Sequence, residues 1–532
     1  MVFPRLLISS LLLFASVACT RGNPPDPVPP DPGTAFFVRQ ACKLPQEQLI
    51  RTWNGYYPGR SGDIQIVPRE PNTVGNWFSH AGPWDYLQDV PMFVYGPGQV
   101  PALGRVARPV TMADVAPTMA RLVGFDFDAP DGSPMREVLP TGTAQPAPRL
   151  VVAVVWDSVG DNVLATHPDS WPTLRSLIPE GVWFEHAIAG SSPSITGPVH
   201  ASLGTGAWAR RHGSIDHWFR LNGRMVESEQ VGPDAVLIPA MADLYDRARG
   251  NQPVIGVSAY NGWHLAMAGH GSSFQGGDRD VGITVIPGTK RWGLSKVNEP
   301  FFRFPSYVRD VPPPDEREID GADGALDGRL RGDARLLDGL RWTLWQRDVL
   351  AEVIRAEKFG SDEVPDLLFI NFKRTDDAGH IWTMNSEEMA TLVRASDAAL
   401  DDLIRVLNRE VGRGGWVLLL TADHGSTPKV EVSGGFQIEE SILREDLLAT
   451  FDRDGDDRPS IMLQRPSQVW VDQAELQENG FTLEQVARYL GEYTKAQNRQ
   501  DPGFLKPEER DDRVFAAAFP SDLLDDLPCL PT

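Results

Sequence analysis

Carboxylates and histidines follow three apolar segments that lie far apart in the sequence. Asp157 comes directly after LVVAVVW, Asp376 and His380 follow DLLFIN within the run TDDAGH, and Asp423 and His424 follow WVLLLT. Carboxylate oxygens and imidazole nitrogens suit zinc, and other divalent metals could take the same ligands. The pattern therefore predicts a metal centre assembled from distant parts of the chain.

A hydroxyl residue between the first two segments could complete such a centre. Thr196 lies in the run SSPSITGPVHASLGTG, and a hydroxyl beside metal ligands can become an activated nucleophile. Ser192 and Ser194 are rival nucleophiles, and Thr196 could instead be an ordinary turn or capping residue. Asp157 could likewise only cap a helix. For Asp157 we favour metal ligation, and for Thr196 we favour the role of nucleophile. Together these roles predict a hydrolase that transfers phosphoryl groups at a two-metal site.

The elements that must position these residues alternate between strand and helix patterns. Helices are predicted at 342–358 and at 386–409, the second with Asn385 or Ser386 as its cap. The runs predicted as strands are DIQIVP, PMFVYG, LVVAVVW, PVIGVS, DLLFIN and WVLLLT. The fold class is therefore α/β, a three-layer α/β/α sandwich around a mostly parallel sheet. Ligands that follow parallel strands are expected to meet at the carboxyl edge of that sheet.

Composition limits the partners of the chain. With 532 residues and a formal net charge of −22, the protein can hold a large core, and we expect no nucleic acid polymer as a partner. A small phosphorylated substrate remains compatible, because bound metal ions reverse the local field.

The first residues are typical of an export signal. Arg5 precedes the apolar run LLISSLLLFA, so residues 1–18 are predicted to be a signal peptide, with Cys19 as a lipidated residue. There are two alternatives. The chain could be cleaved after Ala18 to give an unlipidated product, or the apolar run could be a short membrane anchor. Residues 19–35 are predicted to form a Pro-rich tether. We expect an exported protein, either periplasmic or a cell-surface lipoprotein.

Four motifs, taken together, resemble the alkaline phosphatase superfamily, in particular its type I phosphodiesterase and nucleotide pyrophosphatase branch. They are VVAVVWDSVGDN, PSITGPVHASLGTG, KRTDDAGH and TADHGSTP, in the order of the family. The resemblance implies two zinc ions and a phosphothreonine intermediate. It assigns Asp157, Asp423, His424 and the nucleophile Thr196 to one zinc, and Asp376 and His380 to the other.

The second zinc then lacks a histidine, which in the family comes after the DHG motif. No histidine follows His424 here, but the segment around His80, ending in VPMFVYGPG, looks like the closing segment of the family. The resemblance therefore implies a circular permutation. Residues 36–147 would match the C-terminal part of the family's catalytic domain, and residues 148–532 would form the rest, with an insertion or cap at 271–333.

This permutation also bears on the cysteines. Apart from Cys19, the chain has Cys42 and Cys529 alone. If the chain is permuted, its two ends lie near the single point at which the unpermuted chain would have been opened. Both cysteines are then close to that point, and a Cys42–Cys529 disulfide is expected. In the loop-entropy account, a bridge over so long a segment contributes roughly 4 kcal/mol or more.

Two departures from the family concern the substrate. Superfamily monoesterases with a threonine nucleophile commonly carry a Lys-x-Arg pair, and the aligned positions here are Tyr260, Asn261 and Gly262. His217 falls where the family often has an asparagine that binds a phosphoryl oxygen, so we assign it a catalytic role, against the alternative of a surface histidine. The missing pair favours phosphodiester or pyrophosphate substrates, because a dianionic monoester needs more positive charge.

Two other functions remain as alternatives. The first is an alkaline phosphomonoesterase, and the second is a surface binding protein that keeps the fold without catalysis. Three further histidines are expected to be structural or to support the metal ligands rather than to bind metal themselves: His200, His212 and His270. Three aromatic residues could line a leaving-group pocket or could only pack in the core: Trp218, Trp263 and Phe274.

Overall fold

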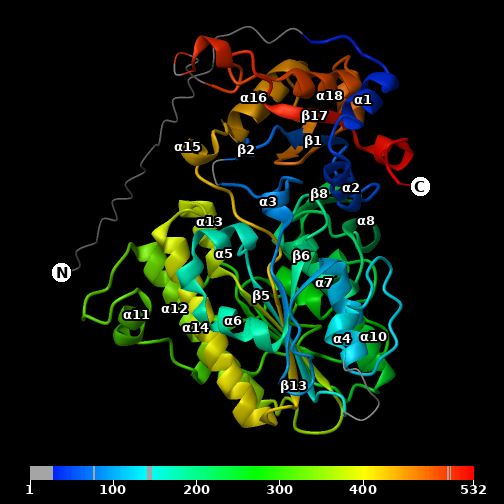
Figure 1. Ribbon diagram of the computed structural model, residues 1–532. Coiled ribbons are helices and arrows are strands. Elements are labelled where there is room, and N and C mark those ends of the chain that lie inside the picture. Colours follow the sequence, from blue (N-terminus) through cyan, green and yellow to red (C-terminus); the bar gives the residue numbers. More distant parts are fainter. Residues whose placement is uncertain (1–27, 76–77, 140–145, 500–502, 504, 532) are drawn as a thin grey trace, which may run out of the picture.

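A nine-stranded sheet forms the centre of the protein, as a computed structural model shows for residues 28–75, 78–139, 146–499, 503 and 505–531 (Figure 1). Only β3 and β11 in this sheet run antiparallel to the others. In spatial order the strands are β11 (Trp292–Gly293), β10 (Val281–Val285), β9 (Ile255–Ser258), β12 (Asp366–Phe372), β5 (Leu150–Trp156), β13 (Trp416–Thr421), β3 (Met92–Tyr95), β6 (Val182–Ile188) and β4 (Gly104–Thr111).

Helices cover both faces of this sheet, which explains the continuous apolar sequence of its strands. Every residue of β5 is buried. Side chains alternate along a strand, so Val152 and Val154 pack with α12 (Ala334–Ala356) and α14 (Glu387–Leu407). Val151 and Val155 face α4 (Val115–Leu122), α7 (Thr196–Thr205) and α10 (Met241–Ala248) on the other side. The predicted three-layer α/β/α fold is thus confirmed.

The predicted helices differ from the observed ones mainly at their first residues. Ser386 caps α14, because its Oγ accepts a hydrogen bond from the Met389 amide at 3.1 Å. The helix predicted at 342–358 begins earlier, at Ala334. The carboxylate of Asp333 caps it there by accepting from the amides of Arg335 and Leu336.

A smaller antiparallel sheet, which the sequence did not predict as a separate layer, lies beyond the carboxyl edge of the large one (Figure 1). The predicted strand DIQIVP lies here as β1 (Ile64–Pro68), between two strands from the other end of the chain. The order is β15 (Ile461–Arg465), β16 (Gln468–Val471), β1 and β17 (Phe515–Pro520). The helices α1 (Thr34–Ala41), α16 (Glu440–Phe451) and α18 (Leu483–Glu492) pack with it in one core.

The segment predicted as an insertion or cap, 271–333, has two parts. Its strands β10 and β11 form one edge of the large sheet, with β10 parallel to β9. The remainder contains α11 (Glu316–Ala322) and connecting loops. In the described part of the chain, no helix is both long and apolar enough to cross a bilayer. The predicted signal peptide and Cys19 lie outside the described residues.

The two ends of the described chain meet at a disulfide. Cys42 follows α1, and it is bonded to Cys529 with the two Cα atoms 5.7 Å apart. The bridge confirms the predicted pairing and spans 487 positions of sequence.

We expect the Cys42→Ser variant to lose about 4 kcal/mol of unfolding free energy, because the bridge restricts the unfolded chain over nearly its whole length. Denaturant unfolding of the oxidised wild type and the variant measures this. Cys529→Ser should lose the same amount, and the double variant no more than either single one. Additive losses would show that the thiols act separately and would contradict the prediction.

Candidate functional site

The carboxyl edge of the large sheet brings the predicted metal ligands together. β12 and β13 are parallel neighbours of β5, so the residues that follow them, Asp376 and Asp423, meet Asp157 at one edge. His80 instead precedes its strand, β3. Because β3 is antiparallel, its first residues pair with the last residues of β13, which puts His80 at the same edge.

One group of side chains contains Asp157, Asp423 and His424. The His424 Nε2 atom lies 3.2 Å from Asp423 Oδ2 and 3.7 Å from Asp157 Oδ1. Asp423 Oδ1 accepts hydrogen bonds from the amides of Ser158 and His424, which holds the carboxylate in place. Burial and the charge of Asp157 raise the pKa of Asp423 to about 6. Such crowding of negative charge is expected where a cation binds.

A second group contains Asp376, His380 and His80. The Asp376 carboxylate lies 3.4 Å from His380 Nε2 and 3.5 Å from His80 Nε2. The ring of His80 stacks on that of His424, with centroids 3.5 Å apart. His424 Nε2 is also 3.9 Å from Asp376, so this histidine borders both groups.

The hydrogen bonds of the three histidines fit metal ligation. Each Nδ1 faces a backbone carbonyl oxygen, to which it can only donate, so in the neutral ring each Nε2 presents its lone pair toward the carboxylates. The carbonyls belong to Ser194 for His80, Phe78 for His380 and Gly425 for His424. In the described part of the protein, Asp423 Oδ2, Asp376 Oδ1 and His424 Nε2 are buried without a hydrogen-bond donor or acceptor. Burial lowers the pKa of His380 and His424, but the carboxylates of Asp376 and Asp423 outweigh it and raise both, that of His424 to about 9. A divalent metal ion can take the place of these protons between nitrogen and carboxylate, so the donor set fits divalent metal ions.

Thr196 is the first residue of α7, and it is 1% exposed. Lys373 links its hydroxyl to both groups, because Lys373 Nζ is 3.0 Å from Thr196 Oγ1, 2.6 Å from Asp376 and 3.3 Å from Asp157. The rival hydroxyls are engaged elsewhere. Ser192 Oγ donates to the Ala81 carbonyl and Ser194 Oγ donates to the His80 carbonyl.

Lys373 was not predicted as a site residue, although it lies in the run KRTDDAGH. It follows β12 directly and is 9% exposed. Burial alone would lower the pKa of its ammonium, but the carboxylates of Asp157 and Asp376 raise it above its ordinary value. The sequence could have indicated this role, because Lys373 stands between the end of a predicted strand and Asp376. That position places its ammonium at the same sheet edge as the carboxylates.

His217, the other predicted catalytic residue, also lies next to Thr196. Its ring stacks on Trp263 with centroids 4.4 Å apart, and its Cδ2 atom would lie 3.4 Å from a Cβ added at Gly197. Burial, with a smaller effect of Lys373, lowers the pKa of His217 to about 3, so the ring is neutral at ordinary pH. Within the described part of the chain its buried Nε2 has no hydrogen-bond partner.

Two of the histidines expected to be structural lie away from the metal ligands. His212 Nε2 contacts Ser202 Oγ at 3.0 Å, and His270 Nδ1 contacts Asp243 at 2.8 Å. His200 is nearer, because its Nδ1 donates to the carbonyl of Thr196. His264, to which the sequence assigned no role, lies 3.7 Å from Asp157.

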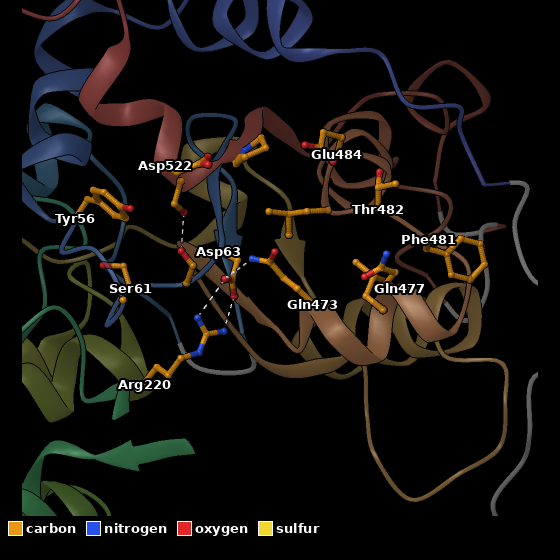
Figure 2. A pocket seen from close by; sticks show the side chains of 16 residues that line it. Tyr56, Ser61, Asp63, Arg220, Gln473, Gln477, Phe481, Thr482, Glu484 and Asp522 are labelled. Carbon is orange, nitrogen blue, oxygen red and sulfur yellow. Dashed lines mark hydrogen bonds and ion pairs between the residues drawn. The ribbon is translucent and has the colours of Figure 1, made fainter. Parts of the chain in front are cut away.

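A cavity of about 430 Å³ lies away from these residues, beside the small sheet (Figure 2). None of the predicted site residues lines it. Asp63, its central carboxylate, already pairs with Arg220 at 2.6 Å and accepts from the Val471 amide and the Gln473 side chain. The cavity therefore supports no role in the chemistry considered above.

Known proteins resemble parts of this chain. Alkaline phosphatase PhoV of Synechococcus elongatus is 38% identical over 74 residues, 14% of each protein. Alkaline phosphatase PhoD of Zymomonas mobilis is 25% identical over 315 residues, 52% of this chain and 53% of that protein. The chain thus spans about half the length, or less, of these relatives.

A solved structure and a family model also resemble this chain, and each matches more than half of it. The crystal structure of wild-type alkaline phosphatase PafA has a TM-score of 0.50, covers 70% of this chain and 83% of its own, and is 17% identical, which shows a shared fold. The model of the family described as type I phosphodiesterase / nucleotide pyrophosphatase matches residues 151–527. The chain therefore belongs to the type I phosphodiesterase and nucleotide pyrophosphatase family of the alkaline phosphatase superfamily.

Proposed function

We propose that this protein is an exported hydrolase that cleaves phosphodiester or pyrophosphate bonds through a phosphothreonine intermediate. The observation that carries the proposal is the contact of the Thr196 hydroxyl with Lys373, whose ammonium also contacts Asp157 and Asp376 in a cluster of three carboxylates and three imidazoles. A hydroxyl in a cluster of this composition is suited to nucleophilic attack at phosphorus.

The donor set fits two zinc ions. Asp157, Asp423, His424 and Thr196 would hold one ion, and Asp376, His380 and His80 the other, because their oxygen and Nε2 atoms converge at one sheet edge. Bound zinc supplies positive charge that lowers the pKa of the nucleophile and stabilises the leaving oxygen.

The residues of the chain then act on the substrate directly. The Thr196 hydroxyl loses its proton to solvent, and its oxygen forms a bond to phosphorus while the bond from phosphorus to the leaving oxygen breaks; the leaving oxygen takes up a proton from solvent. Water later attacks phosphorus and releases the phosphoryl group, and Thr196 regains its proton. A neutral His217 can donate an N–H to a phosphoryl oxygen, since its buried Nε2 lies near the first turn of α7. Trp263 holds that ring by stacking.

The substrate preference rests on charge near the phosphoryl group. Of the two positions of the missing Lys-x-Arg pair, Tyr260 carries an uncharged ring and Gly262 has no side chain. The Arg374 guanidinium lies 3.9 Å over the Tyr260 ring and pairs with Asp377. Neither position of the pair therefore offers a positive charge to a phosphate. This favours a diester or a pyrophosphate, whose transferred group carries less charge than a monoester.

A phosphomonoesterase is the second candidate, and one observation favours it. Lys373 Nζ is a cation 3.0 Å from the Thr196 hydroxyl, and the substrate preference predicted from the sequence did not consider it. It could offset the extra charge of a monoester. The relatives named above are alkaline phosphatases by name, which supports the same candidate.

We expect kcat/KM to be at least about tenfold higher for an aryl phosphate diester than for the matching monoester, with zinc in excess. Assaying both esters on one enzyme preparation measures the ratio. In Lys373→Met the monoester rate should fall more than the diester rate, because the dianion loses more attraction. A large monoester preference in the wild type would instead establish the second candidate.

The third alternative, a surface binding protein without catalysis, differs in its metal content. Metal analysis of the purified, metal-replete protein distinguishes it, because fewer than about one zinc ion per chain would favour a binding protein.

Export and permutation remain parts of the proposal. The Cys42–Cys529 bridge supports an oxidising compartment, in which a lipid on Cys19 would tether the chain to a membrane. The insertion of β1 between β16 and β17 supports the assignment of 36–147 to the family's C-terminal part and 148–532 to the rest. His80 at Asp376 supports it as well.

A further inference from the structure

A second group of carboxylates lies outside the site described above. Asp246 belongs to α10, while Asp278 and Asp280 lie in the loop that leads into β10. One carboxylate oxygen of each residue lies within 4.8 Å of those of the other two. Three negative side chains from two separate segments therefore converge on one point.

Within the described residues, one oxygen of the buried Asp246 carboxylate has no hydrogen-bond partner. The residue is 3% exposed, and its buried Oδ1 receives no hydrogen bond from the described part of the chain. A buried carboxylate is costly unless hydrogen bonds or a cation compensate it. Asp280 is similarly buried, at 8% exposure, whereas Asp278 is exposed and opens the group to solvent.

The surrounding charges do not compensate these residues. The guanidinium of Arg303 is the cation that acts on Asp278 and Asp280, but it forms two hydrogen bonds with Glu357, at 3.1 and 2.7 Å. Burial and the charges of Asp278 and Asp243 raise the pKa of Asp246 to about 7. Burial and its carboxylate neighbours, Asp246 first, raise that of Asp280 well above its ordinary value.

Another acidic group in the chain provides a contrast. Asp452, Asp454 and Glu475 also converge, and the buried Glu475 Oε2 likewise receives no hydrogen bond from the described residues. There, however, the Arg458 guanidinium lies 3.3 Å from that oxygen, and the Asn479 amide donates to Asp454. Asp243, beside the first group, accepts hydrogen bonds from the amides of Ala240 and His270. The Asp246 group differs because the guanidinium that acts on its members Asp278 and Asp280, that of Arg303, is hydrogen-bonded to Glu357.

We propose that Asp246, Asp278 and Asp280 bind a calcium ion that fastens the loop before β10 to helix α10. Oxygen ligands alone favour a hard cation, and the irregular arrangement of carboxylates from a helix and a loop suits calcium better than the strict octahedron of magnesium. Water reaching the exposed side of Asp278 completes the coordination. The site is separate from the zinc ligands, because it shares no residue with them.

The test is calcium binding to the full-length protein held in excess zinc without chelator. Titration with CaCl2 in a calorimeter should give about one site per chain, and saturating calcium should raise Tm by about 2 °C or more. Asp246→Asn and Asp280→Asn should each weaken calcium binding at least about tenfold. Without calcium, each variant should unfold at or above the wild-type Tm, because a repelling charge has been removed.

Asp423→Asn is the matched control, since it alters a proposed zinc ligand and leaves the three aspartates intact. It should keep the calcium response. Loss of the response in Asp423→Asn but not in Asp246→Asn would place the calcium effect at the zinc ligands and overturn the proposal. The absence of any calcium binding by the wild type would overturn it as well. A variant at the exposed Asp278, Asp278→Asn, keeps the test decisive if the buried variants fail to fold.

Discussion

Thr196→Ala is expected to lower kcat for an aryl phosphate diester by at least about 10³-fold, because no phosphothreonine can form. Thr196 is the hydroxyl that contacts Lys373, and Lys373 in turn contacts the carboxylates of Asp157 and Asp376. Thr196→Ser keeps an oxygen in nearly the same place and should retain a measurable part of the rate. Steady-state kinetics on both variants with zinc in excess measure the effect.

The neighbouring serines provide the controls for this result. Ser192→Ala removes a hydroxyl that donates to the Ala81 carbonyl and should keep the rate within about tenfold. Ser194→Ala should do the same, because the carbonyl that receives the His80 proton belongs to the backbone. If Ser194→Ala abolished activity while Thr196→Ala retained it, Ser194 would be the nucleophile instead.

His80→Ala is expected to remove about one zinc ion per chain and to lower kcat/KM by at least about 10²-fold. The imidazole supplies an Nε2 atom 3.5 Å from Asp376, and its Nδ1 is fixed by the carbonyl of Ser194. Alanine leaves the second metal with one histidine, His380. Metal content by mass spectrometry, together with kcat/KM at increasing zinc concentration, measures both effects.

The control for His80 is a histidine that is partly buried but outside the site. His167 contacts the Met384 carbonyl through its Nε2 atom, so His167→Ala should keep the metal content and the rate. Circular dichroism of both variants establishes that the fold is retained. Full zinc content in a folded His80→Ala variant would contradict the ligand assignment, and with it one argument for the permuted order of the chain.

The central layers of the fold could be predicted from local sequence. The strands at LVVAVVW, DLLFIN and WVLLLT are apolar nearly throughout, because helices cover both of their faces, and each segment shows this pattern by itself. The positions of Asp157, Asp376 and Asp423 after these strands followed from the same pattern, because parallel strands end at one edge.

Other parts of the site depended on long-range pairing. The sequence suggested His80 only through a resemblance, and it reaches Asp376 because β3 runs antiparallel beside β13, a pairing between segments far apart in the chain. The small sheet was missed for a related reason. β1 lies between β16 and β17, so its partners come from the opposite end of the sequence.

The sequence by itself determined the apolar strands, the helices between them and the residue types that follow each strand, because these depend on periodicity and local capping. Only the tertiary structure decided that Lys373 lies at Thr196 and that Asp246 meets Asp278 and Asp280. A charged residue shows its role through its distance to other charges and its removal from water. Both the distance between charges and their burial depend on how separate segments pack together, so they cannot be predicted from any single segment.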